Sequence, residues 1–125
     1  MFRRFAKLGK EYSDGDVIAR QGEKGDYMYV VEEGEVQAML ETPPGSEIQV
    51  EILKPGDIFG EMVLFTGASY AATYIARGIT RVISIDKGLF LKRISEDPSL
   101  AFHMVRELAM RIQKLEKEIV LLKSS

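Results

Sequence analysis

The residues with the clearest chemical potential form a turn near the middle of the chain. It begins at Gly60, where a missing Cβ lets a ligand lie against the backbone. The carboxylate of Glu61 and an apolar run with helical spacing follow. Amides at the start of a short helix can bind an anion, and a carboxylate can accept hydrogen bonds from a sugar hydroxyl. The candidate ligand-binding residues are Phe59, Gly60, Glu61, Met62, Val63, Ser69, Tyr70, Ala71 and Ala72.

Residue types that enzymes use most often are scarce. His103 is the single histidine and there is no cysteine, so the usual nucleophile–base pairs and a metal-binding histidine cluster are unavailable. We therefore predict no catalytic residue and no metal site, and we expect a protein that is not an enzyme. The pair Glu32-Glu33 stands beside Gly34, and we interpret it as solvated charge at a hairpin turn.

Length and composition limit the partners. A chain of 125 residues is the size of one domain, because domains run to roughly 100–150 residues. The net charge of −2 gives no general attraction to nucleic acid or to an anionic membrane. No apolar run approaches the ~20 residues that span a bilayer, and the absence of cysteine fits a cytoplasmic protein.

Short apolar runs separated by glycines predict a mainly β fold with helices (α+β), built as a sandwich or barrel and not as a parallel α/β sheet. Turns are predicted at Thr42–Gly45 and Lys54–Asp57, where proline and glycine occur together. The expected strands are Val17–Ile18, Tyr27–Val31, Val36–Leu40, Ile48–Leu53 and Val82–Ile85. Within one domain over residues 1–125, we expect a helical segment at 1–9, a strand-rich region at 11–94 that contains the turn at 59–73, and a C-terminal helix at 95–123.

The C-terminal helix carries a heptad seam. From Asp97-Pro98-Ser99 onward no further glycine or proline occurs, so a long helix can form. Apolar residues step by three and four, with β-branched residues at a and leucines at d, which favours a parallel two-stranded coiled coil. The predicted dimer interface contains Val105, Leu108, Ile112, Leu115, Ile119 and Leu122. Arg111 can face Glu116 of a second copy, and Glu118 can face Lys123.

The glycine spacing and the turn together resemble the cyclic nucleotide-binding domain family, which includes the catabolite activator protein and the regulatory subunits of cyclic-AMP-dependent kinase. The resemblance runs from about Tyr12 through the helix after Pro98. It rests on Gly15-Asp16, Gly22-Glu23, Gly34, Gly56-Asp57, Phe59-Gly60-Glu61 and Ala71-Ala72. The resemblance implies that residues 11–94 form a β-roll, a jelly roll or double-stranded β-helix, with a phosphate-binding cassette at 59–73. It also implies cyclic AMP or cyclic GMP as ligand and a regulatory role in signal transduction.

One departure from the family pattern concerns the ligand. The family places an arginine where this chain has Tyr70, after Ser69 in place of the usual proline. In the family that arginine meets the cyclic phosphate, while the glutamate matched by Glu61 holds the ribose. Leu115 and Glu116 stand where the catabolite activator has a hydroxyl pair that contacts the base.

Three functions therefore stay open. The first is a small-ligand sensor that signals to an unknown downstream protein. The second is a binder of a different small molecule. The third is a dimeric interaction module that keeps the fold and binds no ligand. The chain stops where family transcription factors begin a helix-turn-helix, so we expect no DNA reading by that route.

Overall fold

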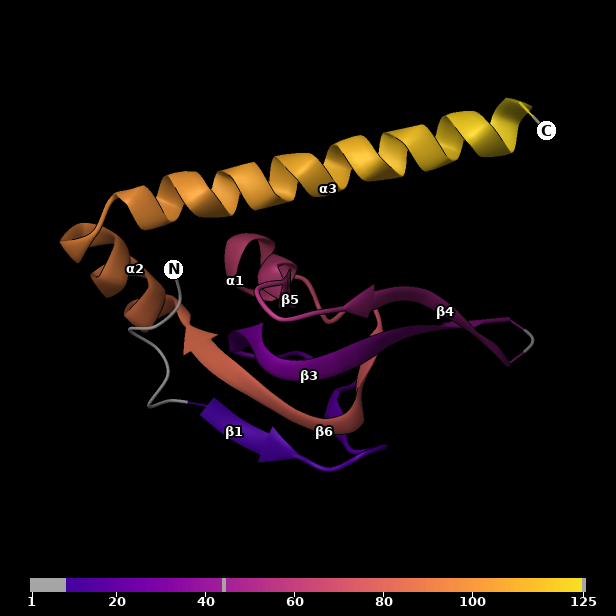
Figure 1. Cartoon of the computed structure of the whole chain (residues 1–125), viewed down its shortest axis with the longest axis horizontal. Helices are drawn as coiled ribbons and strands as arrows, with labels where there is room; N and C mark the ends of the chain where they lie inside the picture. The colour runs from indigo at the N-terminus through magenta and orange to yellow at the C-terminus, as the bar shows by residue number, and fades with distance from the viewer. Residues whose placement is uncertain (1–8, 44, 125) are drawn as a thin grey trace. The chain divides into compact units, whose positions relative to one another are not determined.

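An antiparallel β-roll occupies most of residues 9–86 in the computed structural model, which describes residues 9–43 and 45–124 (Figure 1). The sheet order is β1-β6-β3-β4, with β2 paired to β6 and β5 paired to β3. The strands are β1 (Gly9–Tyr12), β2 (Val17–Ala19), β3 (Tyr27–Thr42), β4 (Ser46–Leu53), β5 (Ile58–Phe59) and β6 (Thr73–Asp86). The mainly β fold expected from the glycine spacing is confirmed. The expected helix at 1–9 falls on residues that are not described, except Gly9, which begins β1.

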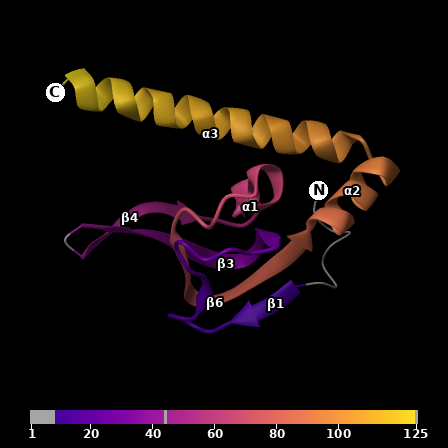
Figure 2. The same cartoon turned by 180° about the vertical axis from the view of Figure 1, so that it is seen from behind.

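The long strands β3 and β6 form the centre of the sheet and lie side by side in both views (Figures 1 and 2). Their pairing runs from Tyr27 opposite Asp86 to Met39 opposite Thr73, with register shifts near Gly34. The interpretation of Glu32-Glu33 as charges at a hairpin turn is therefore wrong. Gly34 has a positive φ, but it lies at a β-bulge within the continuous strand β3 and not at a turn. Glu32 is half-buried and accepts a hydrogen bond from Arg81 Nε at 3.1 Å.

Both predicted turns form. The β3–β4 hairpin closes with Thr42 paired to Ser46, and the Gly45 amide donates to the Thr42 carbonyl at 2.7 Å. At the second turn the Asp57 amide donates to the Lys54 carbonyl at 2.9 Å, and the Asp57 carboxylate accepts from the Lys54 amide at 2.8 Å. These contacts set the start of β5, which leads directly into the candidate ligand-binding turn.

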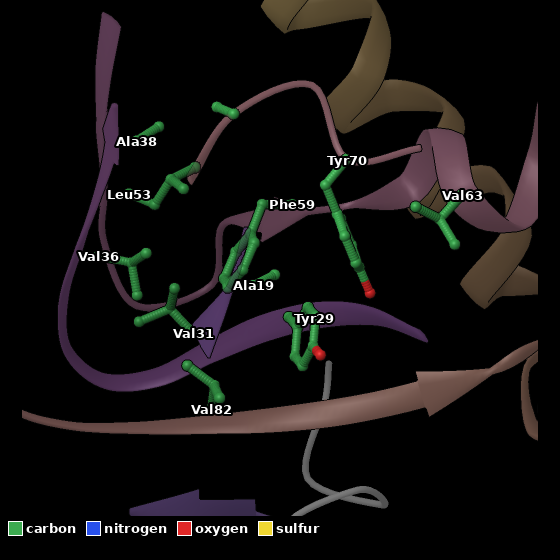
Figure 3. Close-up of a cluster of buried hydrophobic side chains, with 11 residues drawn as sticks. Ala19, Tyr29, Val31, Val36, Ala38, Leu53, Phe59, Val63, Tyr70 and Val82 are labelled. Atoms are coloured by element: carbon green, nitrogen blue, oxygen red, sulfur yellow. The ribbon is translucent and has the colours of Figure 1, made fainter. Parts of the chain in front are cut away.

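Side chains from β2 to β6 fill the interior of the roll (Figure 3). Many are β-branched or aromatic, the types that pack well on a pleated surface. The buried cluster contains Ala19, Tyr29, Val31, Val36, Ala38, Leu53, Phe59, Val63, Tyr70, Ala72 and Val82. Four predicted ligand-binding side chains, those of Phe59, Val63, Tyr70 and Ala72, therefore belong to the core of the fold.

Three helices occur in the described residues: α1 (Glu61–Thr66), α2 (Lys87–Glu96) and α3 (Ser99–Ser124). The chain divides into two compact units between Leu89 and Phe90. Helix α2 starts one residue after β6, so the strands end at Asp86 although the roll was predicted to reach residue 94. The long helix begins at Ser99, four residues later than the predicted start at residue 95, because α2 extends to Glu96. Ser99 Oγ donates to the Asp97 carboxylate at 2.5 Å. No helix among residues 9–43 and 45–124 has the length and apolar character to cross a bilayer.

Candidate ligand-binding site

The predicted ligand turn joins β5 to α1 in a left-handed backbone conformation. Gly60 has φ 75° and ψ 12°, which an L side chain rarely adopts, and it stands at the N-cap of α1. Glu61 follows at the first helical position and is 8% exposed, an uncommon burial for a carboxylate. The turn thus places the buried Glu61 directly after Gly60, at the start of α1.

Tyr70 fills the space beside this turn. Its side chain is 7% exposed, and its hydroxyl donates to the Tyr27 carbonyl at 2.8 Å. A Cβ added to Gly60 would lie 3.0 Å from the Tyr70 ring, and one added to Gly25 would collide with the Tyr70 hydroxyl. Only glycines at both positions leave room for the ring. Tyr70 is therefore built into the fold at the position where the family has its arginine.

Backbone hydrogen bonds hold the Tyr70 segment against the loop between β2 and β3. The Tyr70 amide donates to the Glu23 carbonyl at 3.0 Å, and the Gly22 amide donates to the Tyr70 carbonyl at 2.9 Å. The Gln21 amide also donates to Thr73 Oγ1 at 3.0 Å. The loop that contains Gly25 and the segment that contains Tyr70 are thus fixed to each other, although they lie far apart in the sequence.

Four aromatic rings pack together behind the turn. Tyr29 stacks on Phe59 with ring centroids 5.0 Å apart, and Phe59 meets Tyr74 at 4.5 Å. Tyr70 lies 6.3 Å from Tyr29 and edge-on to Tyr74 at 6.5 Å. These separations are typical of favourable aromatic pairs. Figure 3 shows Tyr29 and Tyr70 side by side, with the Tyr70 oxygen pointing toward Tyr29.

The two buried phenols lie next to each other. Tyr70 donates its proton to the Tyr27 carbonyl, so toward Tyr29 its oxygen can act only as an acceptor. Burial raises the pKa of Tyr29 well above its ordinary value, and the neighbouring Tyr70 hydroxyl raises it further. Burial also raises the pKa of Tyr70. Both phenols are neutral at physiological pH, and neither can supply the charge of a guanidinium.

An open cavity of about 240 Å³ lies beside Tyr70. Its walls come from β2, from the start of β3 and from the loop between them. The lining residues are Ile18, Ala19, Arg20, Glu23, Lys24, Gly25, Asp26, Tyr27, Tyr29 and Tyr70. Of the predicted site residues, only Tyr70 lines this cavity. Sequence reasoning missed the contribution of the β2–β3 loop, whose signal was the glycine-rich stretch from Gly22 to Gly25.

The other predicted site residues occupy different surroundings. Ala72 is buried in the core cluster, Ser69 is half-buried, and Met62 and Ala71 are exposed. Arg77 and Arg81 follow on β6 and could compensate for the lost arginine if they reached the cavity, but neither is among its lining residues. Arg77 is exposed, and Arg81 contacts Glu32. Among residues 9–43 and 45–124, no group of acidic, histidine or cysteine side chains is arranged to hold a metal ion.

The raised pKa of Tyr29 predicts a loss of stability at alkaline pH. The unfolded phenol titrates near 10.0, whereas the folded one keeps its proton to higher pH. Its contribution to stability is therefore complete below pH ~10 and is lost as the pH rises toward the folded-state pKa. We expect the melting temperature of Tyr29→Phe to fall less steeply than that of the wild type from pH ~10 to ~11.5. The exposed Tyr27→Phe is the control, and equal slopes for all three proteins would contradict the prediction.

Comparisons with a family model, with curated proteins and with solved structures all point to the same domain family. A sequence model described as the cyclic nucleotide-binding domain matches residues 9–97. A cAMP-dependent protein kinase regulatory subunit from Dictyostelium discoideum is 39% identical over 82 residues, covering 63% of this chain and 25% of the relative.

Solved structures of proteins from the same family superpose on this chain. The Thermus thermophilus catabolite activator protein superposes with a TM-score of 0.82 at 29% identity, covering 92% of this chain and 54% of that one. The regulatory domain of Toxoplasma gondii PKA, solved with cAMP, superposes with a TM-score of 0.66 at 33% identity, covering 83% and 41%. This chain thus spans a quarter to about half of these relatives. With its β-roll, its Gly60-Glu61 turn and a family match over 9–97, the chain belongs to the cyclic nucleotide-binding domain family.

Proposed function

We propose that this chain is a dimeric regulatory domain that senses a small ligand other than a cyclic nucleotide and signals to a partner protein. The observation that carries the proposal is the placement of Tyr70. It fills the space beside Gly60 and Gly25, and its hydroxyl is already paired with the Tyr27 carbonyl. The cassette keeps its backbone turn and its buried Glu61 but offers a neutral ring where the family offers a cation.

The energetic consequence falls on phosphate binding. A hydrogen bond to a charged group contributes about 1.5–3 kcal/mol, or roughly one to two decades of affinity. A phosphate buried against Tyr70 without a cation would lose about 3–5 kcal/mol. Tyr70 would also have to leave its pocket and break its hydrogen bond to the Tyr27 carbonyl. Both effects act in the same direction, against a cyclic phosphate.

A ligandless interaction module is the second candidate, and the same residue favours it. The Tyr70 hydroxyl pairs with the Tyr27 carbonyl, so this buried phenol needs no ligand to satisfy it. The cavity of about 240 Å³ beside Tyr70 favours the sensor. The two candidates differ in whether any small molecule raises the melting temperature of the protein.

Dimerisation is proposed through α3. The predicted seam is apolar and faces solvent in the single chain, with Ile112 58%, Leu115 50% and Ile119 52% exposed. A stripe of this regularity is stabilised when a second copy supplies the facing holes. Charge complementarity favours a parallel pair of identical chains, since Arg111 would face Glu116 and Glu118 would face Lys123. The occupant that fits this face is therefore a second copy of α3.

The connection between the site and the dimer helix gives the proposed route of the signal. The cassette turn precedes β6, β6 continues into α2, and α2 leads through Asp97 and Pro98 into α3. A ligand that moves the Gly60–Phe65 turn would act on the hinge at residues 95–98. The output would be read by a downstream protein or domain that recognises the altered helix pair.

The proposal predicts weak or absent binding of cyclic AMP. We expect a dissociation constant above about 1 μM, which corresponds to a binding free energy smaller than ~8 kcal/mol in magnitude. Titration calorimetry on the full chain measures it. A thermal-shift screen with cyclic AMP, cyclic GMP and cyclic dinucleotides tests the wider class. A dissociation constant well below 1 μM for any of them would overturn the assignment to a different ligand.

A further inference from the structure

We infer that the cavity beside Tyr70 binds a small compound with a single aromatic ring and one carboxylate. This inference rests on the proposed sensing function and names the ligand class of that site. It is drawn from the size of the cavity, the chemistry of its walls and the charges at its mouth.

The cavity is small for a whole nucleotide. Its volume is about 240 Å³. Pockets for drug-sized ligands run to about 300–1,000 Å³, whereas an apolar cavity of about 150 Å³ is enough to hold benzene. A cyclic nucleotide has a two-ring base, a sugar and a phosphate. A single substituted ring matches the space, whereas most of a nucleotide would extend out of it.

The walls favour an aromatic ligand. Tyr29 and Tyr70 present rings to the cavity, with Ile18 and Ala19 as its aliphatic part. The rings are held from behind, because Tyr29 stacks on Phe59 and Tyr70 packs edge-on to Tyr74. Such a wall is already ordered before a ligand arrives, which lowers the entropic cost of binding. The Tyr70 hydroxyl is paired with the Tyr27 carbonyl, so the wall offers ring surface for stacking.

The mouth offers one weakly paired cation, Arg20, to a ligand carboxylate. Arg20 and Lys24 line it together with Glu23 and Asp26, so its formal charge is balanced and a doubly charged group gains little. Arg20 is only loosely paired: its Nε lies 3.8 Å from Glu23, and the two side chains are 65% and 59% exposed. A ligand carboxylate can replace Glu23 at Arg20 while the ring enters between Ile18 and Tyr70. Guanidinium and carboxylate also match in geometry.

The test is an amide NMR titration of the full chain with phenylacetate up to about 10 mM, the range of a fragment-sized ligand. We expect saturable shifts at Arg20, Gly25 and Tyr27. Cyclohexylacetate keeps the carboxylate and loses the aromatic ring, and we expect it to bind about two- to tenfold more weakly. Phenylacetamide keeps the ring and loses the charge, and we expect a two- to fivefold loss, the scale of an exposed ion pair.

Two arginine variants identify the carboxylate partner. Arg20→Gln should weaken phenylacetate two- to fivefold and leave phenylacetamide unchanged. Arg77→Gln, an exposed arginine outside the cavity, should change neither. Equal affinity for cyclohexylacetate and phenylacetate would overturn the aromatic part of the inference. Equal loss in both arginine variants would overturn the role of Arg20.

The absence of saturable shifts would reject the ligand class. It would leave the sensing function standing if another compound in the thermal-shift screen stabilises the wild type. If no compound in either experiment binds, the sensing function fails as well, and the ligandless module replaces it.

Discussion

Replacing Tyr70 by arginine is expected to raise the affinity for cyclic AMP at least tenfold. The substitution acts twice at one position. It removes the ring that lies against Gly25 and Gly60, and it supplies the bidentate cation that the family uses for phosphate. A charge-assisted hydrogen bond contributes about 1.5–3 kcal/mol, and each 1.4 kcal/mol is a factor of ten. The gain depends on the turn at Gly60 and the buried Glu61, which are both in place.

A neutral variant separates the two effects. Tyr70→Met vacates most of the ring position without adding charge, so any gain it shows measures the removal of the ring alone. Titration calorimetry with cyclic AMP on wild type, Tyr70→Met and Tyr70→Arg gives the three dissociation constants, and thermal melts establish that each variant is folded. A folded Tyr70→Arg that binds no better than Tyr70→Met would mean that the phosphate does not sit at this position.

Residue types and local motifs were enough to locate the cassette turn, but they did not predict the shape of the site. Gly60 and Glu61 could be singled out from their residue types alone. In the structure Gly60 is a left-handed N-cap and Glu61 is a buried carboxylate. Whether the Tyr70 ring can be buried beside the turn depends on Gly25, which is 45 positions earlier in the chain. No local pattern shows that this glycine leaves the room into which the Tyr70 ring fits. The burial of Tyr70, at the position of the family's arginine, therefore follows from long-range packing and not from a local sequence pattern.

The strands show the same limit. The turns at 42–45 and 54–57 were predictable because proline, glycine and aspartate fix backbone angles locally. Gly34 was ambiguous, since a glycine with positive φ serves a hairpin or a bulge equally well. Its role was settled by the pairing of β3 with β6 on both sides of the bulge. The first strand, β1, has only four residues and too little pattern to be recognised, and its pairing with β6 defines it.

The existence and the C-terminal end of the long helix, in contrast, were predictable from the sequence, although its start was predicted four residues too early. Its heptad alternation, the proline at its start and the lack of later glycine or proline are all local signals, and α3 spans Ser99–Ser124. The same heptad pattern predicts that the apolar stripe of α3 is buried against a second helix. Leu115 is 50% exposed in the single chain, and so are its seam neighbours to a similar extent. Such a stripe is expected to be covered by a partner.

Replacing Leu115 by lysine is therefore expected to convert a dimer into a folded monomer. In a parallel pair the two d-position lysines face each other across the two-fold axis in an apolar seam. Neither charge finds a partner there, and the cost is several kcal/mol for the pair. The β-roll has its own buried core and should stay folded. Light scattering should give ~28 kDa for the wild type, twice the chain mass of 14.1 kDa, and the chain mass itself for Leu115→Lys.

The matched control is Met110→Lys. Met110 is 51% exposed, almost the same as Leu115, and lies on the same helix, but the heptad puts it at f, away from the seam. It adds the same charge in place of an apolar side chain of similar exposure, so it should remain a dimer. A wild type that is monomeric at tens of micromolar would reject the dimer altogether. A Leu115→Lys protein that stays dimeric would place the interface elsewhere, because no parallel coiled coil accommodates two facing lysines at its central d layer without a large loss of affinity.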